Sequence, residues 1–170
     1  MKIITQRLQL EPTQVDDAHF ILQLVNTPDW LMNIGDRNVH SVQDAEDYIR
    51  TRMLPQYQRL GYGNFTVREL ATGNPVGTCG LYDREGLEGI DLGFAFLPQY
   101  QRRGYGFESA TALMAHARQH WGMQHMKAIT LEINTASRKL LEKLGFRLTG
   151  PVMLEGDAEE LLRYTWTTEE

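Results

Sequence analysis

The 170-residue sequence contains one cysteine, Cys79, and lacks any long apolar run. A single thiol cannot form an internal disulfide and leaves no second thiolate for a zinc site, which fits a reducing compartment. No segment is apolar enough to span a membrane, and the N-terminal segment has no signal-peptide core because Arg7 interrupts it early. We therefore expect a cytoplasmic protein with no membrane partner, in which Cys79 is a small core residue.

Positive charge is also scarce. The chain has 17 Lys and Arg against 22 Asp and Glu, a formal net charge of −5 with neutral histidine. Binding to a phosphate backbone generally needs a basic surface, so nucleic acid is not an expected partner. His116 and His120 have the i, i+4 spacing of some metal ligands, but no Glu intervenes and no third ligand is near. The sequence therefore predicts no metal site.

No repeat, low-complexity tract or linker divides the chain, so residues 1–170 are predicted to form one domain. Hydrophobic periodicity and turn signals predict the order strand, two helices, three strands, helix, strand, helix and two strands. The expected elements are a strand at 7–11, a helix from Asp16 that stops at Thr27 and Pro28, a helix from Ser41 toward Leu60 with a kink or break at Pro55, an antiparallel meander of strands at 64–70, 76–82 and 89–97, a helix at 107–121, a strand at 127–133, a helix at 136–144, and strands at 146–149 and 161–167. This order is typical of a mixed α+β fold around one sheet.

The most informative stretch is a glycine-rich turn between a predicted strand and a predicted helix. Such a turn points free backbone N–H groups and the positive end of the helix dipole at one small volume, which suits an anion. Gly104 and Gly106 would let a pyrophosphate approach the backbone, while Arg102 and Arg103 add positive charge. The turn is neither a P-loop nor a dinucleotide-binding fingerprint. Two glycines that merely shape a loop remain the alternative.

A second strand-to-helix junction begins at Asn134, followed by Ser137. Taken alone, Asn134 is typical of a helix N-cap and Ser137 of a first helical turn. Together, the two junctions resemble the GNAT superfamily of N-acetyltransferases. Residues 101–106 (QRRGYG) match its pyrophosphate-binding pattern, and residues 134–146 match its second half. Residues 5–10 (TQRLQL) and 91–94 (DLGF) are similar to the ribosomal-protein N-terminal acetyltransferase branch, the RimJ/RimL-like proteins.

The resemblance spans residues 3 to 167 and implies a GNAT fold. That fold has a mixed, mostly antiparallel sheet of about six to seven strands flanked by about four helices. The sheet would split between the strands ending at Leu97 and Ile133, with acetyl-CoA in the gap and no metal. The residues implied to bind acetyl-CoA are Phe94, Phe96, Leu97, Gln101, Arg102, Arg103, Gly104, Tyr105, Gly106, Phe107, Asn134 and Ser137.

The resemblance also implies acetyl transfer from the CoA thioester to a primary amine by direct attack. Asp91 shares a strand face with Gly93 and Ala95, which would leave room for substrate beside a carboxylate base. Asp is one methylene shorter than the Glu often found at this position in the branch, which favours a water relay. A solvated strand-face aspartate is the alternative, and Glu132 is the reserve base. Ser137 would protonate the leaving thiolate.

Several points stay open at this level. A non-catalytic module that binds acyl-CoA or a partner protein is the competing function. The acceptor could be a protein N-terminus, a polyamine, an amino acid or an aminoglycoside-like amine, and a homodimer is compatible with the sequence. Five apolar residues near the first two helices belong either to an acceptor pocket or to the core: Trp30, Leu31, Met32, Tyr57 and Tyr62.

Overall fold

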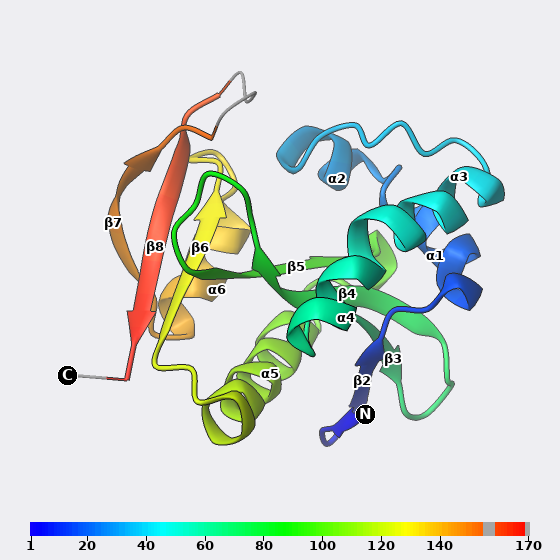
Figure 1. Cartoon of the computed structure of the whole chain (residues 1–170), viewed down its shortest axis with the longest axis horizontal. Helices are drawn as coiled ribbons and strands as arrows, with labels where there is room; N and C mark the ends of the chain where they lie inside the picture. Colours follow the sequence, from blue (N-terminus) through cyan, green and yellow to red (C-terminus); the bar gives the residue numbers. More distant parts are fainter. Residues whose placement is uncertain (155–158, 169–170) are drawn as a thin grey trace.

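The computed structural model describes residues 1–154 and 159–168, and within them the chain folds around an eight-stranded sheet (Figure 1). The strand order is β1-β2-β3-β4-β5-β6-β8-β7. The strands are β1 (Ile3–Ile4), β2 (Leu8–Pro12), β3 (Asn64–Glu69), β4 (Pro75–Asp83), β5 (Ile90–Phe96), β6 (His125–Thr130), β7 (Arg147–Val152) and β8 (Leu161–Thr167). The helices are α1 (Ala18–Leu24), α2 (Pro28–Asn33), α3 (Val42–Tyr48), α4 (Leu54–Leu60), α5 (Tyr105–Trp121) and α6 (Thr135–Lys143).

The predicted α+β class and the mostly antiparallel sheet are confirmed. The described residues hold one more strand than the upper estimate of seven, because β1 has only two residues and is too short to show alternation. The helix that was expected to stop at Thr27 is followed at once by α2. Pro28 suits a first helical position, and Thr27 Oγ1 accepts the Trp30 N–H at 3.3 Å, so the same pair that ends one helix begins the next.

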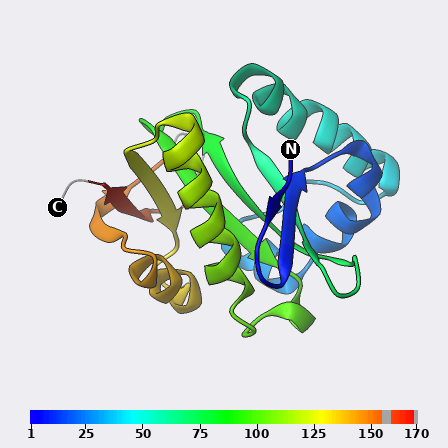
Figure 2. The same ribbon diagram turned by 90° about the horizontal axis from the view of Figure 1, so that it is seen from below.

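Helices cover the two faces of the sheet in separate groups. Figure 2 shows α5 lying across one face beside α6, while α1 to α4 gather at the other side. Leu8 and Leu10 of β2 are fully buried in the core beneath α5, as the alternating pattern predicts. A second core lies around α1 and α3 and includes Leu97, which follows β5. The sheet therefore presents β5 to both helical layers.

The sheet opens between β5 and β6. β4 and β5 are paired along their whole length, from Asp83 with Ile90 to Gly77 with Phe96. β5 and β6 are parallel and register only through Asp91 and Lys127, near the start of each strand. Beyond that pair the strands diverge, and Figure 1 shows β6 turning away from β5. The predicted split is confirmed, and both diverging strands lead into the junctions singled out above.

Candidate active site

The turn between β5 and α5 has the backbone geometry of an anion cradle. Arg102 and Gly104 both have positive φ, +63° and +80°, and Gly104 is the N-cap of α5. The first helical bond runs from Glu108 N to Gly104 O at 3.0 Å. The N–H groups of residues 104–107 precede that bond, so the helix leaves them without acceptors at its positive end. These four amides can hold a doubly charged pyrophosphate.

Glycine is needed at positions 104 and 106 for different physical reasons. A Cβ on Gly106 would lie 2.8 Å from Leu140 Cδ2, so this glycine lets α5 and α6 pack closely. Gly104 has open space apart from Arg7, whose Nη2 lies 3.3 Å from the Cβ position, but its φ of +80° disfavours other residues. Gly106 therefore serves helix packing within α5 rather than the shape of a loop, while Gly104 has the backbone conformation that begins the cradle.

The side chains of the turn differ in their exposure and in their contacts. Arg102 and Arg103 are exposed, and Arg103 lies over the Tyr100 ring at 5.3 Å. Tyr105 is buried and donates its hydroxyl to Glu69 Oε2 at 2.6 Å. This hydrogen bond lowers the pKa of Glu69 and raises the pKa of Tyr105. Among the predicted cofactor ligands, Tyr105 therefore offers its backbone rather than its side chain.

The free edge of β5 can be assigned from one hydrogen bond. Leu97 N donates to Val76 O on β4 at 2.9 Å. Backbone groups alternate sides along an antiparallel strand, so Phe96 and Phe94 direct theirs away from β4, toward the opening beside β6. Gln101 Nε2 already donates to Phe96 O at 3.0 Å and to Asp29 Oδ2 on α2 at 2.9 Å. The backbone groups of these two phenylalanines therefore form a free strand edge with which an extended ligand can pair.

Leu97 differs from Phe94 and Phe96 in how its backbone groups are used. Its N–H is used by Val76, its carbonyl accepts the Tyr100 N–H at 2.9 Å, and its side chain is buried. Side-chain alternation shows which face a residue occupies, but it does not show which edge its backbone groups face. The Leu97 backbone groups are thus already paired within the protein, whereas those of Phe94 and Phe96 face the opening, and the cofactor role of Leu97 stays a prediction.

The junction before α6 places Asn134 and Ser137 together. Asn134 Oδ1 accepts the Ser137 N–H at 3.2 Å, so the N-cap interpretation of Asn134 is confirmed. This bond leaves the Asn134 side-chain NH₂ group to donate elsewhere. Ser137 is half-buried, and within residues 1–154 and 159–168 its hydroxyl has no hydrogen-bond partner. Two polar groups at the start of α6 are thus available to a ligand in the opening.

Glu132 is not on a strand, contrary to expectation. β6 ends at Thr130, and residues 131–133 form a turn in which Asn134 N donates to Leu131 O at 3.0 Å. The Glu132 side chain is exposed, and its carbonyl accepts from Arg138 Nη1 at 3.2 Å. The apolar alternation continues into this turn, which is why the predicted strand is too long.

Asp91 lies in different surroundings from those predicted. It is only 1% exposed, and Arg84 donates to both carboxylate oxygens at 3.2 Å. A Cβ on Gly93 would lie 2.8 Å from the Tyr82 ring, so Tyr82 occupies the space expected beside the small residues. Neither the open face nor the solvated alternative is present. Burial raises the pKa of Asp91, although the Arg84 guanidinium opposes the shift.

Tyr82 begins a buried polar chain that sequence reasoning missed. Its hydroxyl donates to Asn64 Oδ1, and Asn64 Nδ2 donates to Thr13 Oγ1 at 2.8 Å. Thr13 and Thr66 share a hydrogen bond of 2.8 Å, and Thr66 donates to Asp17 Oδ2 at 3.2 Å. The chain fixes the Tyr82 ring, and the Arg84 guanidinium lies 5.6 Å above that ring. Its members come from β3, β4 and the segment that follows β2, so no local motif indicates it.

The other sequence-level candidates lie elsewhere or have ordinary roles. Cys79 is fully buried, and burial raises its thiol pKa to about 12, which confirms it as a core residue. The His116 and His120 rings lie 4.3 Å apart on α5. Tyr57 and Tyr62 pack against the core, whereas Leu31 and Met32 are exposed on α2. No group of three metal-ligating side chains occurs in the described part of the chain.

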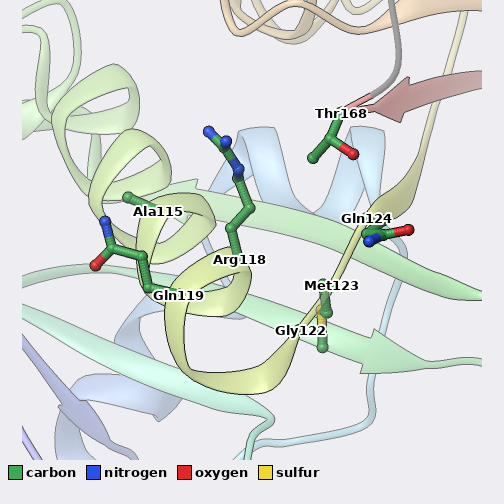
Figure 3. A pocket seen from close by; sticks show the side chains of 7 residues that line it. All are labelled: Ala115, Arg118, Gln119, Gly122, Met123, Gln124 and Thr168. Atoms are coloured by element: carbon green, nitrogen blue, oxygen red, sulfur yellow. The ribbon is translucent and has the colours of Figure 1, made fainter.

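A separate hollow lies at the far end of α5 (Figure 3). Its lining residues are Ala115, Arg118, Gln119, Gly122, Met123, Gln124 and Thr168. α5 has 17 residues and is therefore about 25 Å long, so this hollow is remote from the turn at its N-terminus.

No helix among the described residues is long and apolar enough to cross a membrane.

Comparison with known proteins connects this geometry to one family. A family model described as an acetyltransferase (GNAT) domain matches residues 7–147. A putative GNAT-family acetyltransferase from Bordetella pertussis superposes with a TM-score of 0.83 at 22% identity, covering 98% of this chain and 99% of the other. A putative ribosomal-protein-serine acetyltransferase from Vibrio cholerae gives a TM-score of 0.77 at 22% identity over 98% and 97%. A ribosomal-protein acetyltransferase, RimL, in complex with coenzyme A gives 0.83 at 19% over 98% and 98%. No curated protein matches the chain.

Proposed function

The chain belongs to the GNAT acetyltransferase family, and from this we propose that it transfers an acetyl group from acetyl-CoA to a primary amine by direct attack in a ternary complex. The observation that carries the proposal is the pairing of two helix N-termini, those of α5 and α6, at the open ends of β5 and β6. One helix start offers unpaired amides to a pyrophosphate, and the other offers two free polar groups. A thioester ligand extended between them would have its reactive end beside α6.

The proposed cofactor contacts come from three places. The amides of residues 104–107 hold the pyrophosphate, with Arg102 and Arg103 contributing charge at the rim. The backbone edge at Phe94 and Phe96 pairs with the pantetheine, which requires Gln101 to release Phe96 O. The Asn134 side-chain NH₂ donates to a pantetheine carbonyl. The backbone and amide groups among these either have no hydrogen-bond partner in the described structure or, like Phe96 O, have one that a ligand can displace. This supports their availability to the cofactor.

The chemistry needs a neutral amine and a proton for the leaving thiolate. Acetyl-CoA supplies an activated acyl group: an N–C bond forms while the C–S bond breaks. We propose that Asp91 takes the amine proton through a water molecule, because its carboxylate is only 1% exposed and cannot contact the amine directly. Ser137 gives its hydroxyl proton to the departing sulfur and regains one from solvent. The N-terminal dipole of α6 also favours the thiolate.

The acceptor is proposed as a protein N-terminus or a small-molecule amine. Two structural neighbours bear names that place ribosomal proteins among the substrates of this fold, which supports the first class. The competing function is a non-catalytic module that binds acyl-CoA. We expect free thiol to appear when the protein, acetyl-CoA and a panel of amines, including N-terminal peptides, are combined. Tight CoA binding without thiol release across the panel would instead favour the module.

Replacing Ser137 with alanine is expected to lower kcat by ~10 to 100-fold with little change in CoA affinity, because only proton delivery is lost. Thr135→Ala is the matched control, since Thr135 is an exposed residue in the same helical turn. Steady-state kinetics and calorimetry measure the two quantities. Unchanged kcat across pH would leave Ser137 as a helix-start residue, and a loss of affinity instead would assign it to binding.

A further inference from the structure

Arg7 connects the turn between β1 and β2 to the start of α5. Its Nε lies 2.7 Å from Glu108 Oε1, and its backbone N–H donates to Glu108 Oε2 at 2.9 Å. Its Nη1 donates to the carbonyl of Arg103 at 2.9 Å, and its guanidinium lies 4.6 Å over the Tyr105 ring. One side chain therefore contacts three residues of the turn and first helical turn that form the cradle.

The bond to Arg103 O has a geometric consequence. In a trans peptide the carbonyl of one residue and the N–H of the next point in opposite directions. Because Arg7 holds the Arg103 carbonyl on its own side, the Gly104 N–H must point away from Arg7. Because φ at Gly104 is +80°, the orientation of this amide also determines the direction of the amides that follow it. Arg7 thus sets the direction in which the cradle presents its first donor.

The bond to Glu108 has an electrostatic consequence. A carboxylate in the first turn of α5 stabilises the helix dipole, but it also repels a pyrophosphate at the same helix end. Burial opposes its ionisation, yet hydrogen bonds from Thr5 and Arg7 lower the pKa of Glu108, so it is charged at neutral pH. The Arg7 guanidinium offsets that charge. Without Arg7, the first turn of α5 would carry an uncompensated negative charge at the helix end proposed to hold the pyrophosphate.

We propose that Arg7 is a positioning residue for CoA binding, which orients the Gly104 amide and neutralises Glu108 in the first turn of the helix whose N-terminus would hold the pyrophosphate. This inference rests on the proposed function of the turn. The β1–β2 connection would then contribute to cofactor affinity. This contribution is separate from those of the glycines and the exposed arginines of the turn. Arg7 does not itself contact the reacting atoms, so it should act on cofactor affinity and leave the chemical step intact.

The test is a charge cycle measured by calorimetry with CoA. Arg7→Gln is expected to weaken CoA binding by ~10 to 100-fold, because it loses both the orienting bond and the compensating charge. Glu108→Gln in the Arg7→Gln background is expected to recover ~3 to 10-fold, the electrostatic share. That recovery should shrink in about 0.5 M salt. With acetyl-CoA, Arg7→Gln should raise KM for the thioester and leave kcat and the acceptor KM unchanged.

Arg59→Gln is the matched control, because it removes the same charge from an exposed ion pair with Asp83. Its CoA affinity should equal that of the parent. If Arg7→Gln lowers the melting temperature but binds CoA like the parent, or if Glu108→Gln gives no recovery, the inference is overturned. The Gly104→Val variant discussed below tests the cradle itself. Loss of binding in Gly104→Val without loss in Arg7→Gln would reject the role of Arg7 alone.

Discussion

Replacing Gly104 with valine is expected to weaken CoA binding by ~100-fold or more in a protein that still folds. Gly104 has φ +80° and caps α5, so a β-branched residue there must change the backbone or remain strained. A changed backbone turns the amides of residues 104–107 away from a common point. The valine side chain would also press against Arg7, whose Nη2 lies 3.3 Å from the Cβ position.

Gly73 offers a control with matched backbone strain. It has φ +75° in the turn between β3 and β4, and nothing lies within 4 Å of its Cβ position. Gly73→Val should therefore lower the melting temperature much as Gly104→Val does, yet bind CoA like the parent. Calorimetry with CoA, circular dichroism and thermal unfolding separate the two effects. Parent-like affinity in folded Gly104→Val would mean that the pyrophosphate binds elsewhere.

The parts of the site that sequence reasoning found are those with local causes. The turn before α5 depends on glycines and a helix start within a few residues, and the cap at Asn134 depends on a side chain three residues from its partner. Helices and strands with clear periodicity were found for the same reason. Ser41, for example, caps α3 by accepting the Asp44 N–H at 3.0 Å, as expected of a serine where a predicted helix begins.

The parts that were missed depend on distant neighbours or on side-chain size. Arg7 and Glu108 are 101 residues apart, and no local pattern relates them. Asp91 and Tyr82 are register partners on adjacent strands, so their proximity follows from the hairpin. That the Tyr82 ring fills the space over Gly93 follows only from packing. Local patterns therefore indicate the turn before α5, whereas the surroundings of the proposed base depend on packing between strands.

Replacing Asp91 with asparagine is expected to slow acetyl transfer by ~10² to 10⁴-fold at neutral pH, because the shape is kept and the base is lost. Burial raises the pKa of Asp91, so in the parent the rate should rise as pH increases through that raised value. Asp91→Asn lacks this rise. Part of its lost rate should return as pH approaches the pKa of an alkyl amine, ~9 to 10, since the acceptor then loses its proton in water.

Because Asp91 is paired with Arg84, Asp91→Asn breaks an ion pair as well as removing the base. Arg84→Gln is the control for loss of the ion pair. Asp91→Asn leaves the guanidinium, whose side chain is 34% exposed, without its carboxylate, which should cost about 1–3 kcal/mol of folding stability. Arg84→Gln breaks the same pair but keeps the base. If Asp91 takes the proton, loss of the guanidinium raises the pKa of Asp91 further, so the rate of Arg84→Gln rises at higher pH than in the parent but keeps the rise that Asp91→Asn lacks. The double variant is then as slow as Asp91→Asn.

The opposite pattern would assign Asp91 a different role. If Arg84→Gln is as slow as Asp91→Asn, and both give pH–rate profiles parallel to that of the parent, the carboxylate acts only by holding Arg84 against Tyr82. Proton removal would then fall to water or to Glu132, whose side chain is exposed in the turn before α6. Glu132→Gln discriminates between those two, because it should lower the rate at neutral pH only if Glu132 is the base.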